Sequence, residues 1–472
     1  MTEDSETNLA KNEKEDEISA LDLSSQDLKT ISDYLLTENN QLKDLNLDYN
    51  ELCSLPEDIN FLVNLTKLSI CGNNIEKLPE YMNLLNLEEL LMDENCLESL
   101  PDTFGNLVKL KNLSLIGNRL KSFPSCFEKL HLLQELYGDE NELTIIDFSF
   151  ESLKCLEIFE TSNNKLKTLS SDIGCAVKLR ILNLTSNQFT ALPESMSDLQ
   201  SVEILDLSNN LLVELPERFD SSRTLIKLMV ENNNLKFLPD WITDIPQLEE
   251  LYLSDNAVTN ELFDEQFCES AANLRILEAG ANYMDSISER FGLLTKLEQV
   301  HFGSTISELE RSHFQNGNWM TRLPDSFCDL KHLFKANLNE NQLHSLPDEF
   351  GSLHSLTWLD LGQNMLRHLP STFCELTNLE FLQLSKNRIE KLPENIGNLQ
   401  KLIELRMDFN LLKDVPRSLG TIKRLQALDL FSNKLDALPD IVFQLKNLVR
   451  LDLDQNNFKI SLDKVPKITP GS

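Results

Sequence analysis

The 472-residue chain carries 76 acidic and 43 basic side chains, a formal net charge of −33, and 41% of its residues are hydrophobic. This balance argues against nucleic acid as a partner, because affinity for DNA or RNA rests on cationic contacts to phosphate. No apolar run approaches the roughly 18 residues that a membrane span requires, and the polar start lacks a signal peptide, so we expect a cytoplasmic protein without membrane insertion.

Residues 1–17 hold seven acids, two lysines and no aromatic residue. Such a segment cannot bury enough apolar surface to fold, so we expect a disordered acidic tail. At the other end of the chain, residues 461–472 are expected to form a short C-terminal tail.

Between these tails, residues 18–460 repeat one pattern, LxxLxLxxNxLxxLPxxI. Nineteen repeats begin between Ile18 and Leu448, and fourteen of the eighteen spacings between their starts equal 23 residues. The alternating leucines at repeat positions 4 and 6 predict a short strand with positions 3, 5 and 7 facing outward. The asparagine at position 9 can satisfy the backbone of a buried turn. Proline at position 15 disfavours long helices on the other side of each repeat.

The predicted fold is therefore an α/β repeat solenoid, a leucine-rich-repeat horseshoe with a parallel concave sheet and an extended or 3₁₀ convex side. The 23-residue unit resembles the intracellular Ras-group leucine-rich repeats, of the Ras-suppressor, Scribble/Erbin and Ras-phosphatase scaffold type. The resemblance covers residues 18 to about 460. It implies a scaffold or adaptor for protein partners, with a Ras-type small GTPase or a phosphatase complex as the implied partner.

Outward positions of the early repeats are rich in acid and then in isoleucine. Closely spaced like charges are unfavourable without a cationic partner, so we interpret them as a protein-binding surface. A solvated face of an acidic protein is the alternative. The residues are Glu89, Asp93, Glu94, Glu135, Asp139 and Glu140, followed by Ile158, Ile181 and Ile204.

Two later repeats break the spacing. The repeat that begins at Leu248 has 26 residues, and its segment 259–270 is expected to form a convex helix. The repeat that begins at Leu297 has 36 residues, and we assign the excess to an insertion at about 303–317. This insertion either contributes to binding or is a neutral loop.

Large side chains mark the outward positions of the last repeats. Exposed aromatic and arginine side chains on a strand face are typical of interface hot spots, and mutual packing of the rings is the alternative reading. The recurring Phe327, Phe350 and Phe373 instead predict a core spine. The outward residues are Trp358, Phe381, Arg406, Phe409 and Phe431.

The sequence contains no phosphate-binding loop, no GxSxG and no HExxH, and its histidines and nine cysteines show no ligand spacing. We therefore expect no catalytic, cofactor-binding or metal-binding site, and a protein that is not an enzyme. The predicted function is an intracellular scaffold that binds partners on its concave face. The charge leaves open an acidic chaperone or regulator of basic proteins such as histones, and the resemblance leaves open a phosphatase regulatory subunit.

Overall fold

The computed structural model describes residues 19–32, 36, 41–259, 263–305, 316–437 and 440–458. The chain divides into two compact units, Met1–Gln188 (unit 1) and Phe189–Ser472 (unit 2). The expected tails at 1–17 and 461–472 lie outside the described residues, as do residues 306–315 of the expected insertion.

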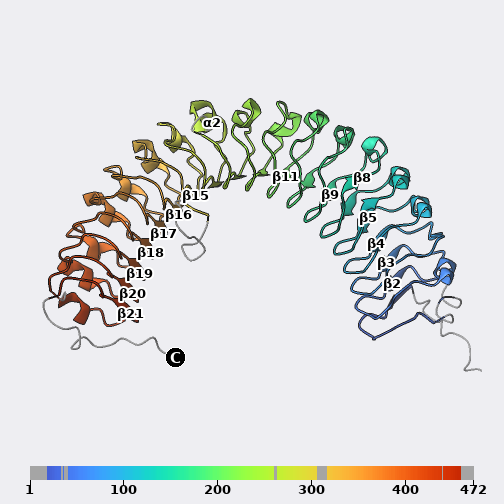
Figure 1. The fold of residues 1–472 in the computed structure, drawn as a ribbon, viewed down its shortest axis with the longest axis horizontal. Coiled ribbons are helices and arrows are strands. Elements are labelled where there is room, and N and C mark those ends of the chain that lie inside the picture. Colours follow the sequence, from blue (N-terminus) through green and yellow to red (C-terminus); the bar gives the residue numbers. More distant parts are fainter. Residues whose placement is uncertain are drawn as a thin grey trace, which may run out of the picture. The chain divides into compact units, whose positions relative to one another are not determined.

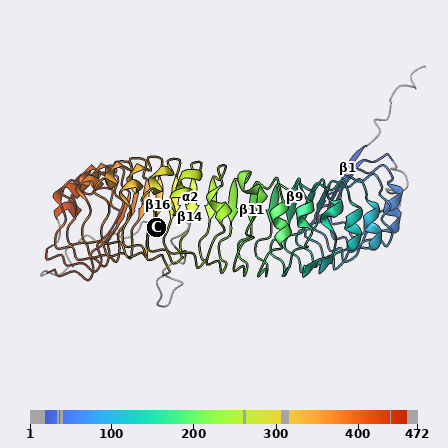
Figure 2. The ribbon, with the colours of Figure 1, turned by 90° about the horizontal axis from the view of Figure 1, so that it is seen from above.

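Each unit is a stack of rungs built around one three-residue strand per repeat. Successive strands pair in parallel and in register, and in both units the rungs follow one another in chain order (Figures 1 and 2). Among the described residues, unit 1 contributes β1 (Ala20–Asp22), β2 (Asp44–Asn46), β3 (Lys67–Ser69), β4 (Glu89–Leu91), β5 (Asn112–Ser114), β7 (Glu135–Tyr137), β9 (Ile158–Glu160) and β10 (Ile181–Asn183). Unit 2 contributes β11 (Ile204–Asp206), β12 (Lys227–Met229), β13 (Glu250–Tyr252), β14 (Ile276–Glu278), β15 (Gln299–His301), β16 (Lys335–Asn337), β17 (Trp358–Asp360), β18 (Phe381–Gln383), β19 (Glu404–Arg406), β20 (Ala427–Asp429) and β21 (Arg450–Asp452).

Short 3₁₀ segments line the convex side of each unit, opposite the strands (Figure 1). Most of them follow the proline at repeat position 15, which has no backbone N–H to donate to a preceding turn. In unit 1 they are η1 (Glu57–Phe61), η2 (Asp102–Asn106), η3 (Ser125–Lys129), η4 (Phe150–Ser152) and η5 (Ile173–Cys175), beside a small pair of strands, β6 (Ser122–Phe123) and β8 (Ile145–Ile146). In unit 2 they are η6 (Glu194–Asp198), η7 (Asp220–Arg223), η8 (Asp240–Thr243), η10 (Phe291–Leu293), η12 (Asp325–Asp329), η13 (Phe350–Ser352), η14 (Ser371–Glu375), η15 (Ile396–Asn398), η16 (Arg417–Thr421) and η17 (Asp440–Phe443).

The irregular repeat at Leu248 forms the convex helix that its sequence predicts. Helix α2 spans Glu265–Ser270, and the Asp264 carboxylate caps it by accepting from the Phe267 amide at 2.8 Å. The solenoid with a parallel sheet and a 3₁₀ convex side is thus confirmed.

Leucines of the strands and phenylalanines of the convex side fill the core. The rings of Phe291, Phe327, Phe350 and Phe373 stack in a row with centroids 6.0, 6.3 and 6.1 Å apart. All four are fully buried, which confirms the predicted spine.

The asparagine at position 9 holds each rung to its neighbours, as predicted. Asn387 accepts a hydrogen bond from the Leu366 amide at 3.0 Å and donates to the Leu361 and Leu384 carbonyls at 2.8 and 3.1 Å. The residue before it adopts a left-handed backbone in almost every described rung, for example φ 52° at Tyr49 and 53° at Phe409. This conformation is unfavourable for side chains with a Cβ, so the asparagine network must stabilise it.

Candidate functional site

Outward-facing side chains of β14 to β19, and of the turns that follow β11, β12, β13 and β15, form one surface on the concave face of unit 2. It has two parts, a carboxylate hollow and an aromatic ladder. The ladder consists of Lys335, Trp358, Phe381 and Arg406. The hollow, about 500 Å³, is lined by Asn209, Glu231, Asn232, Ser254, Asp255, Glu278, His301 and Thr305.

The carboxylate hollow contains an acid that this part of the chain leaves unsatisfied. One carboxylate oxygen of Glu231 is buried and has no hydrogen-bond partner among the described residues. Burial, together with the nearby carboxylates of Glu278, Asp206 and Asp255, raises the pKa of Glu231 to about 7. Lys227 is the cation that acts on Glu231, but its ammonium already pairs with Glu250 at 2.9 Å. The hollow is therefore short of positive charge.

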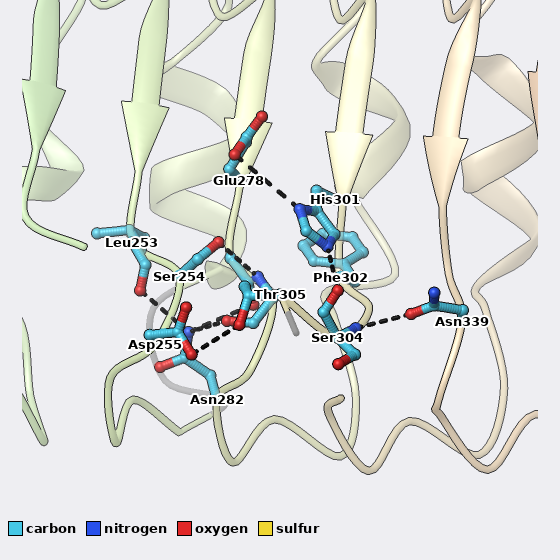
Figure 3. Close-up of polar contacts among 12 residues, drawn as sticks. Leu253, Ser254, Asp255, Glu278, Asn282, His301, Phe302, Ser304, Thr305 and Asn339 are labelled. Carbon is cyan, nitrogen blue, oxygen red and sulfur yellow. Dashed lines mark hydrogen bonds and ion pairs between the residues drawn. The ribbon is translucent and has the colours of Figure 1, made fainter. Parts of the chain in front are cut away.

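His301 connects the hollow to the next rungs, as Figure 3 shows. Its Nε2 lies 3.2 Å from the Ser304 carbonyl oxygen, and its Nδ1 lies 4.0 Å from a Glu278 carboxylate oxygen. A carbonyl oxygen can only accept, so Nε2 carries a proton. The contact with His301 is the main reason that the pKa of Glu278 lies below its usual value.

Gly280 makes room for the histidine ring. A Cβ at this position would lie 2.4 Å from the Gly303 carbonyl oxygen and 3.1 Å from Nε2 of His301. Only glycine permits this close approach of two rungs and a side chain.

Both ends of the insertion are held on this surface. At its start, the Thr305 hydroxyl donates to Asp255 at 2.7 Å and the Ser304 amide donates to Asn339 at 2.7 Å (Figure 3). At its end, the Asn316 amide donates to Glu340 at 3.0 Å. Asn318 then takes the asparagine position of its rung and donates to Phe302 and Ala279 carbonyls, both at 2.9 Å. The extra residues are therefore inserted within the turn, just before the position-9 asparagine, Asn318.

The aromatic ladder runs across four strands. Lys335, Trp358 and Phe381 are direct register partners on β16, β17 and β18. The Trp358 and Phe381 rings lie parallel within 6°, with centroids 5.1 Å apart. The Lys335 ammonium lies 5.6 Å from the Trp358 ring centre, and the Arg406 guanidinium lies 5.6 Å from that of Phe381. Two cations thus cap a stack of two half-buried rings, which confirms the reading of mutual packing. Whether these rings bind a partner stays a prediction.

The two parts meet at a smaller hollow of about 170 Å³. Glu278 and His301 line it together with Lys335 and Trp358 of the ladder. Asp360, two residues after Trp358 on β17, accepts from the Gly362 amide at 2.8 Å and from Asn339 at 3.1 Å. Burial raises the pKa of Asp360 to about 6.

The remaining aromatic residues of the predicted site form a second pair in the same unit. Phe409 and Phe431 meet edge to face with ring centroids 5.3 Å apart, and Phe409 is 48% exposed. Arg406 also pairs with Glu404 at 2.6 Å, and Arg450 reaches the same carboxylate at 2.8 Å.

The predicted acids of unit 1 fall into two groups. Asp93 accepts from the Ile116 amide at 2.8 Å, and the buried Asp139 accepts from the Ser162 amide at 2.7 Å. These two bind the next rung and are largely structural. Glu94 and Glu140 are exposed, Glu89 pairs with Lys67 at 2.9 Å, and Glu135 accepts from the Tyr137 hydroxyl at 3.2 Å.

The predicted isoleucines are half-buried outward residues. Ile158 and Ile181 are register partners on β9 and β10 of unit 1, whereas Ile204 belongs to β11 of unit 2. Whether these isoleucines or the exposed acids bind a protein stays a prediction.

The sequence reading missed Glu231, Glu278, His301 and Lys335. Each occupies an outward strand or turn position, so comparing the same position across repeats would have found them. It also missed Tyr283 and Trp319, which are half-exposed and have ring centroids 5.3 Å apart. Tyr283 and Trp319, called the rim pair below, directly follow the position-9 asparagines Asn282 and Asn318. The rim pair is separate from the aromatic ladder.

Within the described ranges, no group of three or more histidine, cysteine or carboxylate side chains is arranged to hold a metal ion. In the same ranges, no helix has the length and apolar character to cross a bilayer. The surface offers rings, charges and hydrogen-bond donors, which suit recognition of another molecule.

Comparison with known proteins points the same way. A family model described as "Leucine-rich repeat region" matches residues 138–325 and 323–410, more than half of the chain, and one described as "Leucine rich repeat" matches residues 63–120. No curated protein matches the sequence.

Among solved structures, a leucine-rich repeat protein of Leptospira interrogans is 29% identical with a TM-score of 0.57, over 93% of this chain and 90% of that one. A TDR receptor is 26% identical with a TM-score of 0.70, over 93% and 85%. The Arabidopsis receptor kinase HAESA, in complex with the peptide hormone IDA and the co-receptor SERK1, is 26% identical with a TM-score of 0.67, over 94% and 79%.

Proposed function

This chain belongs to the leucine-rich repeat family, and we propose that it is a scaffold whose protein partner docks on the concave face of unit 2. The observation that carries the proposal is the aromatic ladder. Its rings stand on strand positions that face away from the core, and the leucines beside them, such as Leu359 and Leu382, fill the core instead. We therefore expect the fold to tolerate the replacement of Trp358 or Phe381.

Such a patch has the composition of an interface hot spot. Tryptophan and arginine are enriched among residues that dominate binding energy, and rigid aromatic side chains lose little entropy when a partner covers them. The similar receptor HAESA is described in complex with a peptide hormone and a co-receptor, which supports protein or peptide recognition as a use of this fold.

The proposed compartment is the cytoplasm. All nine cysteines are free thiols, including the exposed Cys53. Free thiols in this number favour a reducing compartment. The resemblance to Ras-group repeats adds a finer proposal, that the partner is a Ras-type GTPase or a phosphatase complex.

A second candidate function is an acidic regulator of basic proteins. The net charge of −33 and the unsatisfied carboxylate of Glu231 favour it. Salt separates the two functions. Binding through charge alone weakens strongly at moderate ionic strength, whereas binding through the aromatic ladder persists.

Affinity capture with the full chain, followed by mass spectrometry, tests the proposal. The wild type should retain a partner that the W358A/F381A variant loses. The rim pair gives a control, because Y283A/W319A also removes a tryptophan and the aromatic ring that contacts it. A partner that survives W358A/F381A but is lost with Y283A/W319A would place the interface on the rim.

A further inference from the structure

Resting on the proposed function, we infer that the concave face of unit 2 binds an extended polypeptide segment with a basic side chain and, about six residues away, an aromatic side chain. The basic side chain enters the carboxylate hollow. The aromatic side chain lies across the outer edges of the aromatic ladder.

The geometry of the aromatic ladder favours binding of an aromatic side chain. Strand order puts Lys335 and Phe381 on opposite sides of Trp358. Beyond Phe381, the register partner on β19 is Glu404, and the Arg406 guanidinium lies over the Phe381 ring, 5.6 Å from its centre. Each ring face thus has a neighbour, and the ring edges point away from the sheet.

Ring edges are positive and ring faces are negative. Lys335 adds a positive charge at one end of the ladder, whereas Arg406 at the other end is paired with Glu404. The face of an incoming aromatic ring complements both the edges and the Lys335 ammonium, whereas an aliphatic side chain complements neither.

The carboxylates of the hollow favour binding of a cationic side chain. Glu231, Asp255 and Glu278 come from three neighbouring rungs and line one space of about 500 Å³. One Glu231 oxygen is buried without a partner among the described residues, and Lys227 is held by Glu250. A lysine or arginine side chain from a partner would supply the missing donor.

The spacing follows from the sheet. The hollow is centred on β13 and the ladder on β17, four strands further on. Four strand spacings are about 19 Å, and about six residues of extended chain cover that distance. Glu278 and His301 line both hollows, so the path between the anchors is continuous.

A random library of displayed 12-residue peptides tests this inference. Peptides are selected on the full-length wild type and counter-selected on W358A/F381A. The enriched peptides should carry lysine or arginine five to seven residues from tyrosine, tryptophan or phenylalanine. Enrichment of acidic peptides, of peptides without an aromatic residue, or of none specific to the wild type overturns the inference.

The consensus peptide is then synthesised and its affinity measured by fluorescence polarisation. E231Q/E278Q should weaken binding at least tenfold, while E375Q on the convex side changes it less than twofold. Replacing the peptide's basic residue by glutamine should cause the same loss and add little to E231Q/E278Q. Replacing its aromatic residue by cyclohexylalanine should weaken binding at least fivefold.

The inference and the proposed function fail differently. If a captured partner needs Trp358 and Phe381 but is indifferent to E231Q/E278Q, the scaffold function stands and the two-anchor inference is wrong. If the partner is indifferent to both double variants, the proposed function is wrong as well.

Discussion

The indole of Trp358 and the ring of Phe381 stack in parallel on neighbouring strands while the leucines beside them fill the core. Their contact should stabilise the fold only modestly. A double-mutant cycle of W358A and F381A, measured by urea unfolding, should give a coupling of about 0.5–1.5 kcal/mol. The far-ultraviolet circular dichroism of the double variant should match the wild type, and its collapse would make the pair structural.

The position-9 asparagine of each rung should contribute more to the free energy of unfolding than the Trp358–Phe381 contact does. Asn187 accepts from the Leu166 amide at 3.0 Å and donates to the Thr161 carbonyl at 2.8 Å, both buried. Asn187→Ala should destabilise the protein by about 1–3 kcal/mol, because it leaves buried backbone groups unpaired. Hydrogen exchange should increase around this rung, since rungs contact their nearest neighbours. The exposed Asn106→Ala is the control, and unchanged exchange in Asn187→Ala would count against the asparagine network.

The pKa of Glu231 predicts a pH dependence of stability. A folded-state pKa of about 7, above the ordinary value of 4.5, means that the folded protein holds this proton more tightly than the unfolded chain. Stability is therefore lost as pH rises from about 4.5 to 7 and stays lower above that range.

Glu231→Gln removes this loss. The variant should match the wild type at pH 4.5 and exceed it at pH 8 by an amount on the order of 2–3 kcal/mol in urea unfolding. The convex Glu375→Gln should show no such trend. An advantage of Glu231→Gln that is equal at both pH values would rule out titration of this group as the cause.

Removing residues 305–317 should leave the fold intact. The deletion joins Ser304 to Asn318, which already occupies the asparagine position of its rung, and it breaks the Thr305–Asp255 and Asn316–Glu340 bonds at the surface. Circular dichroism and a melting temperature within a few degrees of the wild type are expected. Failure of the deletion protein to fold would assign the insertion to the core.

The repeat made much of this architecture predictable. A column of residues 23 positions apart lies side by side, so the leucine core, the asparagine network and the pairing of Trp358 with Phe381 follow from counting. Two features do not follow from it. The repeat pattern places Asp93 and Asp139 at outward positions and so predicts that they are exposed. In the structure their carboxylates instead accept a hydrogen bond from a backbone amide of the next rung. Glu278 and His301 are themselves 23 residues apart, but the repeats of 26 and 36 residues on either side remove their other register partners, Tyr252 and Asn337, from the 23-residue count.

A photo-crosslink tests the central claim, that the partner docks on the aromatic ladder, most directly. Phe381→p-benzoylphenylalanine keeps an aromatic ring on β18, and Tyr283→p-benzoylphenylalanine puts the same group on the rim pair. Irradiated with the partner recovered by affinity capture, the protein labelled at 381 should form a covalent adduct and the protein labelled at 283 should not. An adduct from position 283 with none from position 381 would contradict the claim.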